Sequence, residues 1–135
     1  MTSPCVPDSW GEVLDKLTIL EIKLTRLDNP AARANVAHEH ALLRAIVAPV
    51  ADDVAALLGR LRAINLELWD IEDAIRREDA LGRFGAEFVA LARSVYRTND
   101  ERAALKRVIN LRLASEIVEE KSYWVPEAER VAAPG

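Results

Sequence analysis

Polar side chains that interrupt the apolar pattern are the candidates for chemistry in this sequence of 135 residues. Residues three or four positions apart lie on one face of an α-helix. Burying polar groups without partners is costly, so such residues require partners on neighbouring elements. Three groups of this kind occur: Lys16, Glu21 and Lys23; Asn65, Trp69, Glu72 and Arg76; and Arg102, Lys106 and Asn110.

These three groups predict a polar pocket between helices, lined by amides, cations and a carboxylate. Such a pocket suits a small anionic or sugar-related ligand, with Trp69 as a flat wall. Trp69 needs burial for its large apolar area, and turning it inward brings Asn65 and Glu72 part of the way with it. A buried Glu72 then needs a cation from another helix. The candidates to approach it are Lys16, Lys23, and Lys106 together with Asn110.

A simpler interpretation of the same residues remains open. Glu72 and Arg76 are four positions apart and can form an ordinary ion pair along one helix. Arg102 and Lys106 can then lie on the solvated surface. Under this interpretation the chain is a protein–protein interaction or scaffold module, and its polar stripes are salt-bridge networks without a small-molecule site.

Two pairs of acidic residues leave an enzymatic alternative open. Glu12 and Asp15, and likewise Glu67 and Asp70, are three positions apart and lie on one helical face. Such pairs can share a magnesium ion with a substrate phosphate, and Glu72 can replace Asp70 in the second pair. This alternative is a magnesium-dependent hydrolase of phosphorylated or nucleotide substrates. Outside it we expect no cofactor, and the sequence leaves open whether the chain is an enzyme.

Histidine and cysteine add no second site. His38 and His40 point about 200° apart on a helix, so one metal ion cannot easily bind both. We therefore expect no metal ligands there. Cys5 is the only cysteine, which excludes an intramolecular disulfide, and no base lies near it in the sequence to activate it as a nucleophile.

Apolar residues at alternating steps of three and four predict the helices that position these groups. The first helix begins after its N-cap, Asp8 or Ser9, and stops at Asn29-Pro30. The second follows and ends near Pro49. The third spans about residues 52–78 and has the clearest pattern. Its apolar residues are Val54, Leu57, Leu61, Ile64, Leu68, Ile71 and Ile75.

Beyond a turn marked by glycines at 82 and 85, the apolar pattern resumes at Phe88 and predicts a fourth helical segment. Thr98–Glu101 has the form of a capping box, which opens a fifth helix through Ile117 or marks a kink in one longer helix. We therefore expect an all-α fold, an antiparallel bundle of four to five helices with long first and third helices. The single domain is expected over residues 9–123, between a flexible N-terminus at 1–8 and a flexible C-terminal tail at 124–135.

The first helix carries apolar residues on two sides. Ile19 and Ile22 lie off the main seam formed by Leu17, Leu20 and Leu24, so neighbours must cover this helix twice. A central place in the bundle explains this pattern, and so does a subunit interface. We predict a homodimer, because long helices in short chains often bury their remaining face against a second copy.

Composition limits the class of protein. With 18 basic and 22 acidic residues the net charge is −4, which argues against nucleic acid as a partner. No apolar stretch approaches the roughly 20 residues of a membrane span, so we expect no membrane association. The first four residues lack the basic and apolar segments of a signal peptide. These observations predict a cytoplasmic protein.

Four stretches of the sequence together resemble a bacterial family known only as a domain of unknown function. They are SWGEVLDKLTILEIK at 9–23, NLELWDIED at 65–73, ARSVYRTNDER at 92–102 and EEKSY at 119–123. The resemblance implies a helix-rich structure and a bacterial source, and it implies no activity. The stretches contain nearly all the polar residues selected above, as a binding site or a packing network would require.

Overall fold

The computed structural model describes residues 2–132, and within this range the chain forms helices and no β-strand. The all-α bundle predicted from the sequence is confirmed. The expected flexible ends include Met1 and residues 133–135, which lie outside the described residues. The elements are α1 (Trp10–Arg26), α2 (Pro30–Val47), the 3₁₀ turns η1 (Ala48–Val50) and η2 (Asp52–Val54), α3 (Ala55–Ala80), α4 (Ala86–Arg112) and the short α5 (Glu127–Ala132).

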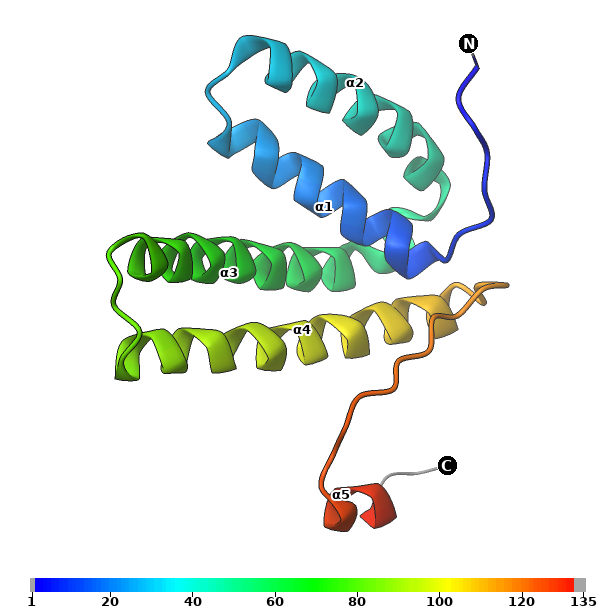
Figure 1. Cartoon of the computed structure of the whole chain (residues 1–135). Helices are drawn as coiled ribbons and strands as arrows, with labels where there is room; N and C mark the ends of the chain where they lie inside the picture. The colour runs from blue at the N-terminus through cyan, green and yellow to red at the C-terminus, as the bar shows by residue number, and fades with distance from the viewer. Residues whose placement is uncertain (1, 133–135) are drawn as a thin grey trace.

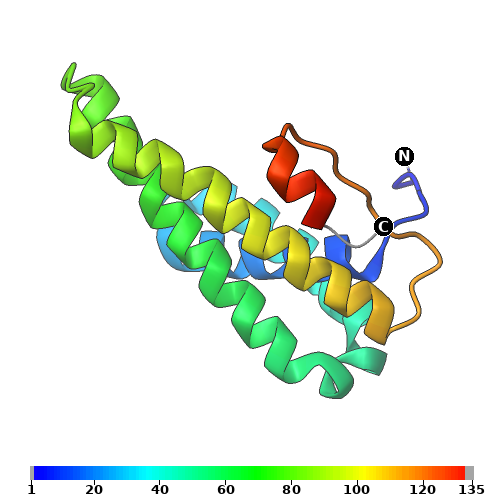
Figure 2. The same cartoon turned by 90° about the horizontal axis from the view of Figure 1, so that it is seen from below.

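Two helical hairpins build the molecule (Figure 1). The longer one pairs α3 with α4 through a turn in which Gly82 adopts a positive φ of 66°. The α1–α2 hairpin packs on one face of it, and α1 contacts α2, α3 and α4. Figure 2 shows the turn end of the α3–α4 hairpin projecting beyond the other helices. Helix α5 stands off from the bundle (Figure 1).

The predicted helix starts are set by local caps. Ser9 is the N-cap of α1, and its side chain accepts a hydrogen bond from the Glu12 amide at 3.2 Å. Asn29 caps α2 in the same way, and Pro30 follows at the first helical position, where its missing N–H is not needed. Ser9 therefore sets the start of α1, and Asn29-Pro30 sets the corner between α1 and α2.

The hydrophobic core lies towards one end of the bundle. Its buried members come from α1, from the end of α2, from η2, from the first half of α3 and from the second half of α4. They are Leu14, Leu17, Val47, Val54, Leu57, Leu61, Leu105 and Ile109. No residue between 69 and 97 is fully buried. The projecting half of the α3–α4 hairpin is thus held by partly buried side chains alone.

Two helix boundaries differ from the sequence prediction. Thr98–Glu101 opens no helix, because the residues before it are already helical and α4 runs through it without interruption. The same helix ends at Arg112 and does not reach Ile117. Ala114 stops it by taking a positive φ of 49°.

The double apolar character of α1 is satisfied within one chain. Leu17, Leu20 and Ile22 are buried, and Ile19 is partly buried. The contacts of α1 with three other helices explain this burial without a second copy. The homodimer therefore stays a prediction, but the two apolar sides of α1 are no longer an argument for it. No helix in residues 2–132 combines the length and apolarity that crossing a bilayer requires.

Candidate functional site

A buried polar network joins α1, α3 and α4. The Asn65 side-chain amide donates one hydrogen bond to Asp15 Oδ1 at 2.7 Å and another to Thr18 Oγ1 at 2.8 Å. The Thr18 hydroxyl in turn donates to the Asp15 carbonyl oxygen at 2.8 Å. All three residues are buried, and both amide hydrogens of Asn65 are used. The amide is therefore fixed in one orientation.

Lys106 carries a buried positive charge in the same network. Its Nζ lies 3.4 Å from Asp15 Oδ2 and 3.8 Å from Glu119 Oε2, and it forms a close ion pair with Glu12. Three carboxylates from α1 and from the segment after α4 thus surround one ammonium group. Such compensation is what a buried charge requires.

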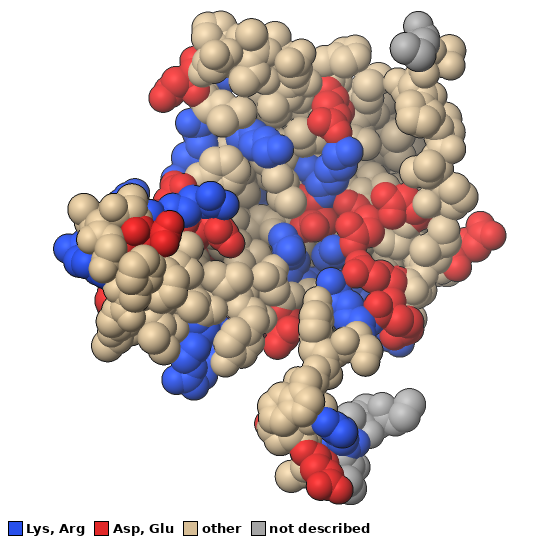
Figure 3. Space-filling model, in the orientation of Figure 1, with Lys and Arg blue, Asp and Glu red and all other residues tan. Residues whose placement is uncertain are grey.

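Glu12 and Glu119 form a coupled carboxyl pair beside Lys106. Burial raises the pKa of Glu12 above its usual 4.5, and the hydrogen bond with Glu119 acts in the same direction. That hydrogen bond, together with the one from Lys121, lowers the pKa of Glu119 to about 2. A proton shared by the pair therefore belongs to Glu12, and Glu119 stays ionised. Figure 3 shows acidic and basic side chains interleaved on this face of the molecule.

Asn65 also connects the network to an open groove between α3 and α4. Its side-chain oxygen accepts a hydrogen bond from Arg102 Nη1 at 3.1 Å. Beyond Arg102 lies a hollow of about 470 Å³, which we call the α3–α4 groove. It is lined by Ile19, Asn65, Leu68, Trp69, Glu72, Asp73, Arg76, Asn99 and Arg102.

The two cations of the α3–α4 groove differ in their partners. Arg76 lies 3.7 Å from Glu72 on the same helix, and their side chains are 78% and 47% exposed. Arg102 has no carboxylate within 4.0 Å among the described residues, and its one hydrogen bond there goes to the neutral Asn65. The groove thus contains a half-buried guanidinium whose charge no acid compensates.

The structure divides the sequence candidates into three sets. Asn65, Trp69, Glu72, Arg76 and Arg102 line the α3–α4 groove. Lys106 and Asn110 are buried and do not line this groove: Lys106 belongs to the polar network, and Asn110 Oδ1 accepts a hydrogen bond from the Gly11 amide at 2.6 Å.

The α1 candidates lie elsewhere. Lys16 pairs with Glu39 of α2 at 2.7 Å, and Glu21 pairs with Arg62 at 2.6 Å and lies 3.5 Å from His40. Lys23 is half-buried and forms no ion pair within the described part of the chain.

The expected burial of Glu72 is not met. Its partner is Arg76 on α3 and no cation from a neighbouring helix. The buried stretch of α3 ends at Leu68, and Trp69 and Glu72 lie past it, where the groove opens to solvent. A half-exposed carboxylate stays hydrated, so it does not need a cation from another helix.

From the sequence, Asp15 was paired with Glu12 as a possible magnesium ligand, and neither Asp15 nor Thr18 was placed beside Asn65. Both are buried and directly follow the core leucines Leu14 and Leu17, and this placement was the available signal. Gly11 was also missed. A Cβ at Gly11 would lie 2.8 Å from the Lys106 carbonyl oxygen, so glycine is what lets α1 approach α4 closely.

The acidic pairs considered for magnesium face cations. Glu12 and Asp15 contact Lys106, and Asp70 accepts a hydrogen bond from Arg26 at 3.1 Å. Glu67 is exposed. Across the described residues no group of three or more His, Cys, Asp or Glu side chains is arranged to hold a metal ion.

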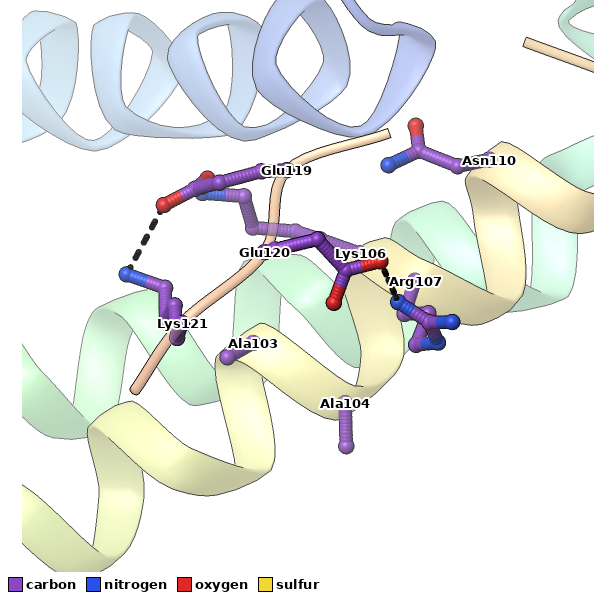
Figure 4. A pocket seen from close by; sticks show the side chains of 8 residues that line it. All are labelled: Ala103, Ala104, Lys106, Arg107, Asn110, Glu119, Glu120 and Lys121. Carbon is purple, nitrogen blue, oxygen red and sulfur yellow. Dashed lines mark hydrogen bonds and ion pairs between the residues drawn. The ribbon is translucent and has the colours of Figure 1, made fainter. Parts of the chain in front are cut away.

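A second hollow lies between α4 and the segment that follows it (Figure 4). It measures about 620 Å³ and is lined by Ala103, Ala104, Lys106, Arg107 and Asn110 of α4 and by Glu119, Glu120 and Lys121. Here the charges are paired: Arg107 Nη1 lies 3.0 Å from Glu120 Oε1, and Lys121 Nζ lies 3.0 Å from Glu119 Oε1.

Comparison with known proteins adds a family without an activity. A family model described as a family of unknown function, DUF6165, matches residues 6–133. The resemblance to a domain family of unknown function is thereby confirmed. No curated protein and no solved structure gives a match. The interpretation of the site therefore rests on its geometry.

Proposed function

We propose that this chain, which belongs to the family of unknown function DUF6165, binds a small anionic, sugar-related ligand in the α3–α4 groove. The observation that carries the proposal is Arg102, whose guanidinium faces the groove without a carboxylate partner among the described residues. A carboxylate or phosphate is the chemical group that such a guanidinium binds best, through charge-assisted hydrogen bonds.

Preorganisation of Arg102 supports this assignment. Arg102 donates to Asn65, and Asn65 is held by Asp15 and Thr18 in the interior. A cation that is already oriented loses less side-chain freedom when a ligand arrives, and this raises affinity. Three helices are thus used to hold one guanidinium at the edge of a groove.

The rest of the groove suits hydroxyl groups and a flat apolar face. Glu72, Asp73 and Asn99 line it with oxygens that can accept hydrogen bonds from hydroxyls. Trp69 provides an aromatic wall. The volume of about 470 Å³ is typical of sites for small molecules. An anionic sugar derivative combines the groups that these side chains recognise.

Isothermal titration calorimetry with a panel of sugar phosphates and sugar acids tests the proposal. We expect at least one member to bind, and Arg102→Leu to weaken it roughly tenfold to a hundredfold through loss of a charge-assisted contact. Arg97→Leu is the matched control, because Arg97 is an exposed cation of the same helix outside the groove. Absence of binding across the panel, or equal binding by Arg102→Leu, would refute the proposal.

Glu72→Gln separates a ligand role from a structural one. Glu72 is half-exposed and has no ion-pair partner on another helix within residues 2–132, so its neutralisation should leave the unfolding free energy within about 0.5 kcal/mol of the wild-type value. If Glu72 accepts ligand hydroxyls, the affinity for the bound panel member should fall. Unchanged affinity with lower stability would assign Glu72 to the fold.

The alternatives predicted from the sequence have weaker support. The pairs Glu12–Asp15 and Glu67–Asp70 would be the magnesium ligands of a hydrolase, yet three of these four acids contact cations. In a scaffold module without a small-molecule site the polar residues would pair with one another, whereas Arg102 lines a hollow of about 470 Å³ and pairs with no carboxylate among the described residues. We therefore place ligand binding first.

A further inference from the structure

Helix α4 ends in a backbone conformation that is unusual for an alanine. The Ser115 amide donates to the Asn110 carbonyl at 2.8 Å, and the Ala114 amide donates to the Leu111 carbonyl at 3.3 Å. This pair of hydrogen bonds is typical of a helix end at which one residue adopts a positive φ. Glycine normally occupies that position. Here Ala114 occupies it with φ of 49°. An alanine in this conformation is strained.

The residues around Ala114 are compatible with a longer helix. Leu113, Ala114 and Glu116 are good helix formers, and no proline or glycine follows until Pro126. Leu113 and Ile117 also continue the four-residue apolar repeat of Leu105 and Ile109. Extending α4 past Arg112 would therefore relieve the strain at Ala114, and it would swing the following segment away from the bundle.

Residues 115–121, which we call the acidic strap, are joined to the bundle through polar contacts. Ser115 Oγ accepts a hydrogen bond from the Trp10 amide at 3.2 Å, which caps the first turn of α1. Glu119 approaches Lys106, and Glu120 pairs with Arg107. Figure 4 shows the strap crossing above α4 with a hollow beneath it. Little apolar surface holds the strap in place, because Ile117 remains 40% exposed.

The contacts that the acidic strap makes with the bundle could also be made by the same segment of another copy. Without the strap, Arg107 would lose its carboxylate and the Trp10 amide would lose its acceptor. A second copy carries an identical strap. Its Glu119 and Glu120 can restore the contacts with Lys106 and Arg107 in trans while both copies release the strained Ala114.

We propose that two copies of this chain exchange their acidic straps, so that Glu119 and Glu120 of each copy complete the Lys106–Arg107 site of the other. The hinge is Ala114, and the exchange extends α4. This inference does not depend on the ligand proposed for the α3–α4 groove. Exchange of a terminal segment through a strained hinge is a low-cost route to a dimer, because it reuses contacts that already exist.

A pair of charge reversals tests the exchange directly. Arg107→Glu and Glu120→Arg each place two like charges at the junction, in the closed monomer and in its own dimer alike. In an exchanged dimer of one copy of each, both junctions regain opposite charges. We expect light scattering on the mixture to give about twice the 15.0 kDa chain mass at concentrations roughly tenfold lower than either variant needs alone.

The controls use the same charge changes away from the strap. Arg97→Glu and Glu87→Arg are exposed positions of α4, and mixing them should not promote assembly. A second variant addresses the hinge: Ala114→Gly removes the strain of the closed form and should weaken the wild-type dimer roughly tenfold or more. A chain that stays monomeric into the high micromolar range would overturn the proposal. So would a mixture no better than its components, or a dimer indifferent to Ala114→Gly.

Discussion

Asn65 is the residue at which the interior of the bundle meets the α3–α4 groove. It donates to Asp15 and Thr18 on α1 and accepts from Arg102 on α4. A single side-chain amide therefore satisfies a buried carboxylate and a buried hydroxyl, and it orients a cation at the surface. No other residue type of this size offers two donors and an acceptor in one plane.

Replacing Asn65 should reveal how much the buried network contributes to stability. We expect Asn65→Ala to lower the unfolding free energy by about 1–3 kcal/mol, because it leaves polar groups of Asp15 and Thr18 buried without their donor. Urea denaturation measures the change. Asn35→Ala is the control, since Asn35 is an exposed residue of α2, and its effect should stay within about 0.5 kcal/mol. Equal stability of the two variants would mean that the buried network contributes nothing.

Glu119 makes a second prediction at this scale, through pH. A carboxyl whose pKa falls from 4.5 in the unfolded chain to about 2 in the folded one stabilises the fold above pH 4.5. This stabilisation is lost as the pH falls from 4.5 towards 2. Because the Glu119 side chain is 40% exposed, solvent screening limits the contribution to about 0.5–1 kcal/mol.

Glu119→Gln should therefore be less stable than the wild type at pH 7, and the difference should shrink as the pH falls below 4.5. Urea denaturation at a series of pH values measures it, with Glu116→Gln as the control at a nearby exposed position. Glu12 acts in the opposite sense, because its raised pKa favours the fold most at low pH. A difference that grows on acidification would show that Glu119 holds the shared proton.

At the scale of elements, the close approach of α1 to α4 positions the polar network. Gly11 lies in the first turn of α1, against the backbone of Lys106 and the side chain of Asn110. The Asn110 side chain in turn accepts a hydrogen bond from the Gly11 amide. A missing side chain and a single hydrogen bond thus set the distance between the helices, and this distance allows Lys106 to reach Glu12 and Asp15.

Gly11→Ala and Gly59→Ala should have opposite effects on stability. At Gly11 the added Cβ meets backbone at 2.8 Å, so the helices must separate, and we expect a loss of about 1–3 kcal/mol. At Gly59, inside α3, nothing lies within 4 Å of the added Cβ. Better helix propensity should there add about 0.5–1 kcal/mol. Thermal unfolding of both variants measures the contrast, and a stabilising Gly11→Ala would contradict the close packing.

At the scale of the whole molecule, the uneven core predicts uneven stability. Fully buried residues of α3 end at Leu68, and those of α4 begin at Thr98. The projecting half of the hairpin should therefore open locally without unfolding the rest.

Amide hydrogen exchange can measure this difference. We expect amides of residues 72–95 to exchange with an opening free energy about 2 kcal/mol or more below that of the core amides. Leu61→Ala is a useful second sample, because truncating this fully buried core leucine should lower the unfolding free energy by about 3–5 kcal/mol. It should lower protection in the core and leave the projecting half nearly unchanged. Uniform protection along α3 and α4 would show one cooperative unit.

Local patterns in the sequence were sufficient to predict three of the helices and the shared helical face of four groove residues. The three–four repeat of apolar residues predicts α1, α2 and α3, and the caps at Ser9 and Asn29 are local hydrogen bonds within one turn. Asn65, Trp69, Glu72 and Arg76 were predicted to share a face because helical geometry alone places them there. Short-range rules are sufficient for such features.

The contacts between polar residues far apart in the sequence depend on how the helices pack. Asp15 contacts Asn65 and Lys106 across 50 and 91 positions of sequence, and no local pattern encodes such pairs. The capping sequence at Thr98 yielded to a continuous α4, and α4 stopped at Ala114 although the residues around it are compatible with a longer helix. Packing against other helices sets the burial of each face, and burial decides whether a polar side chain is solvated, paired or left facing a groove, as Arg102 is.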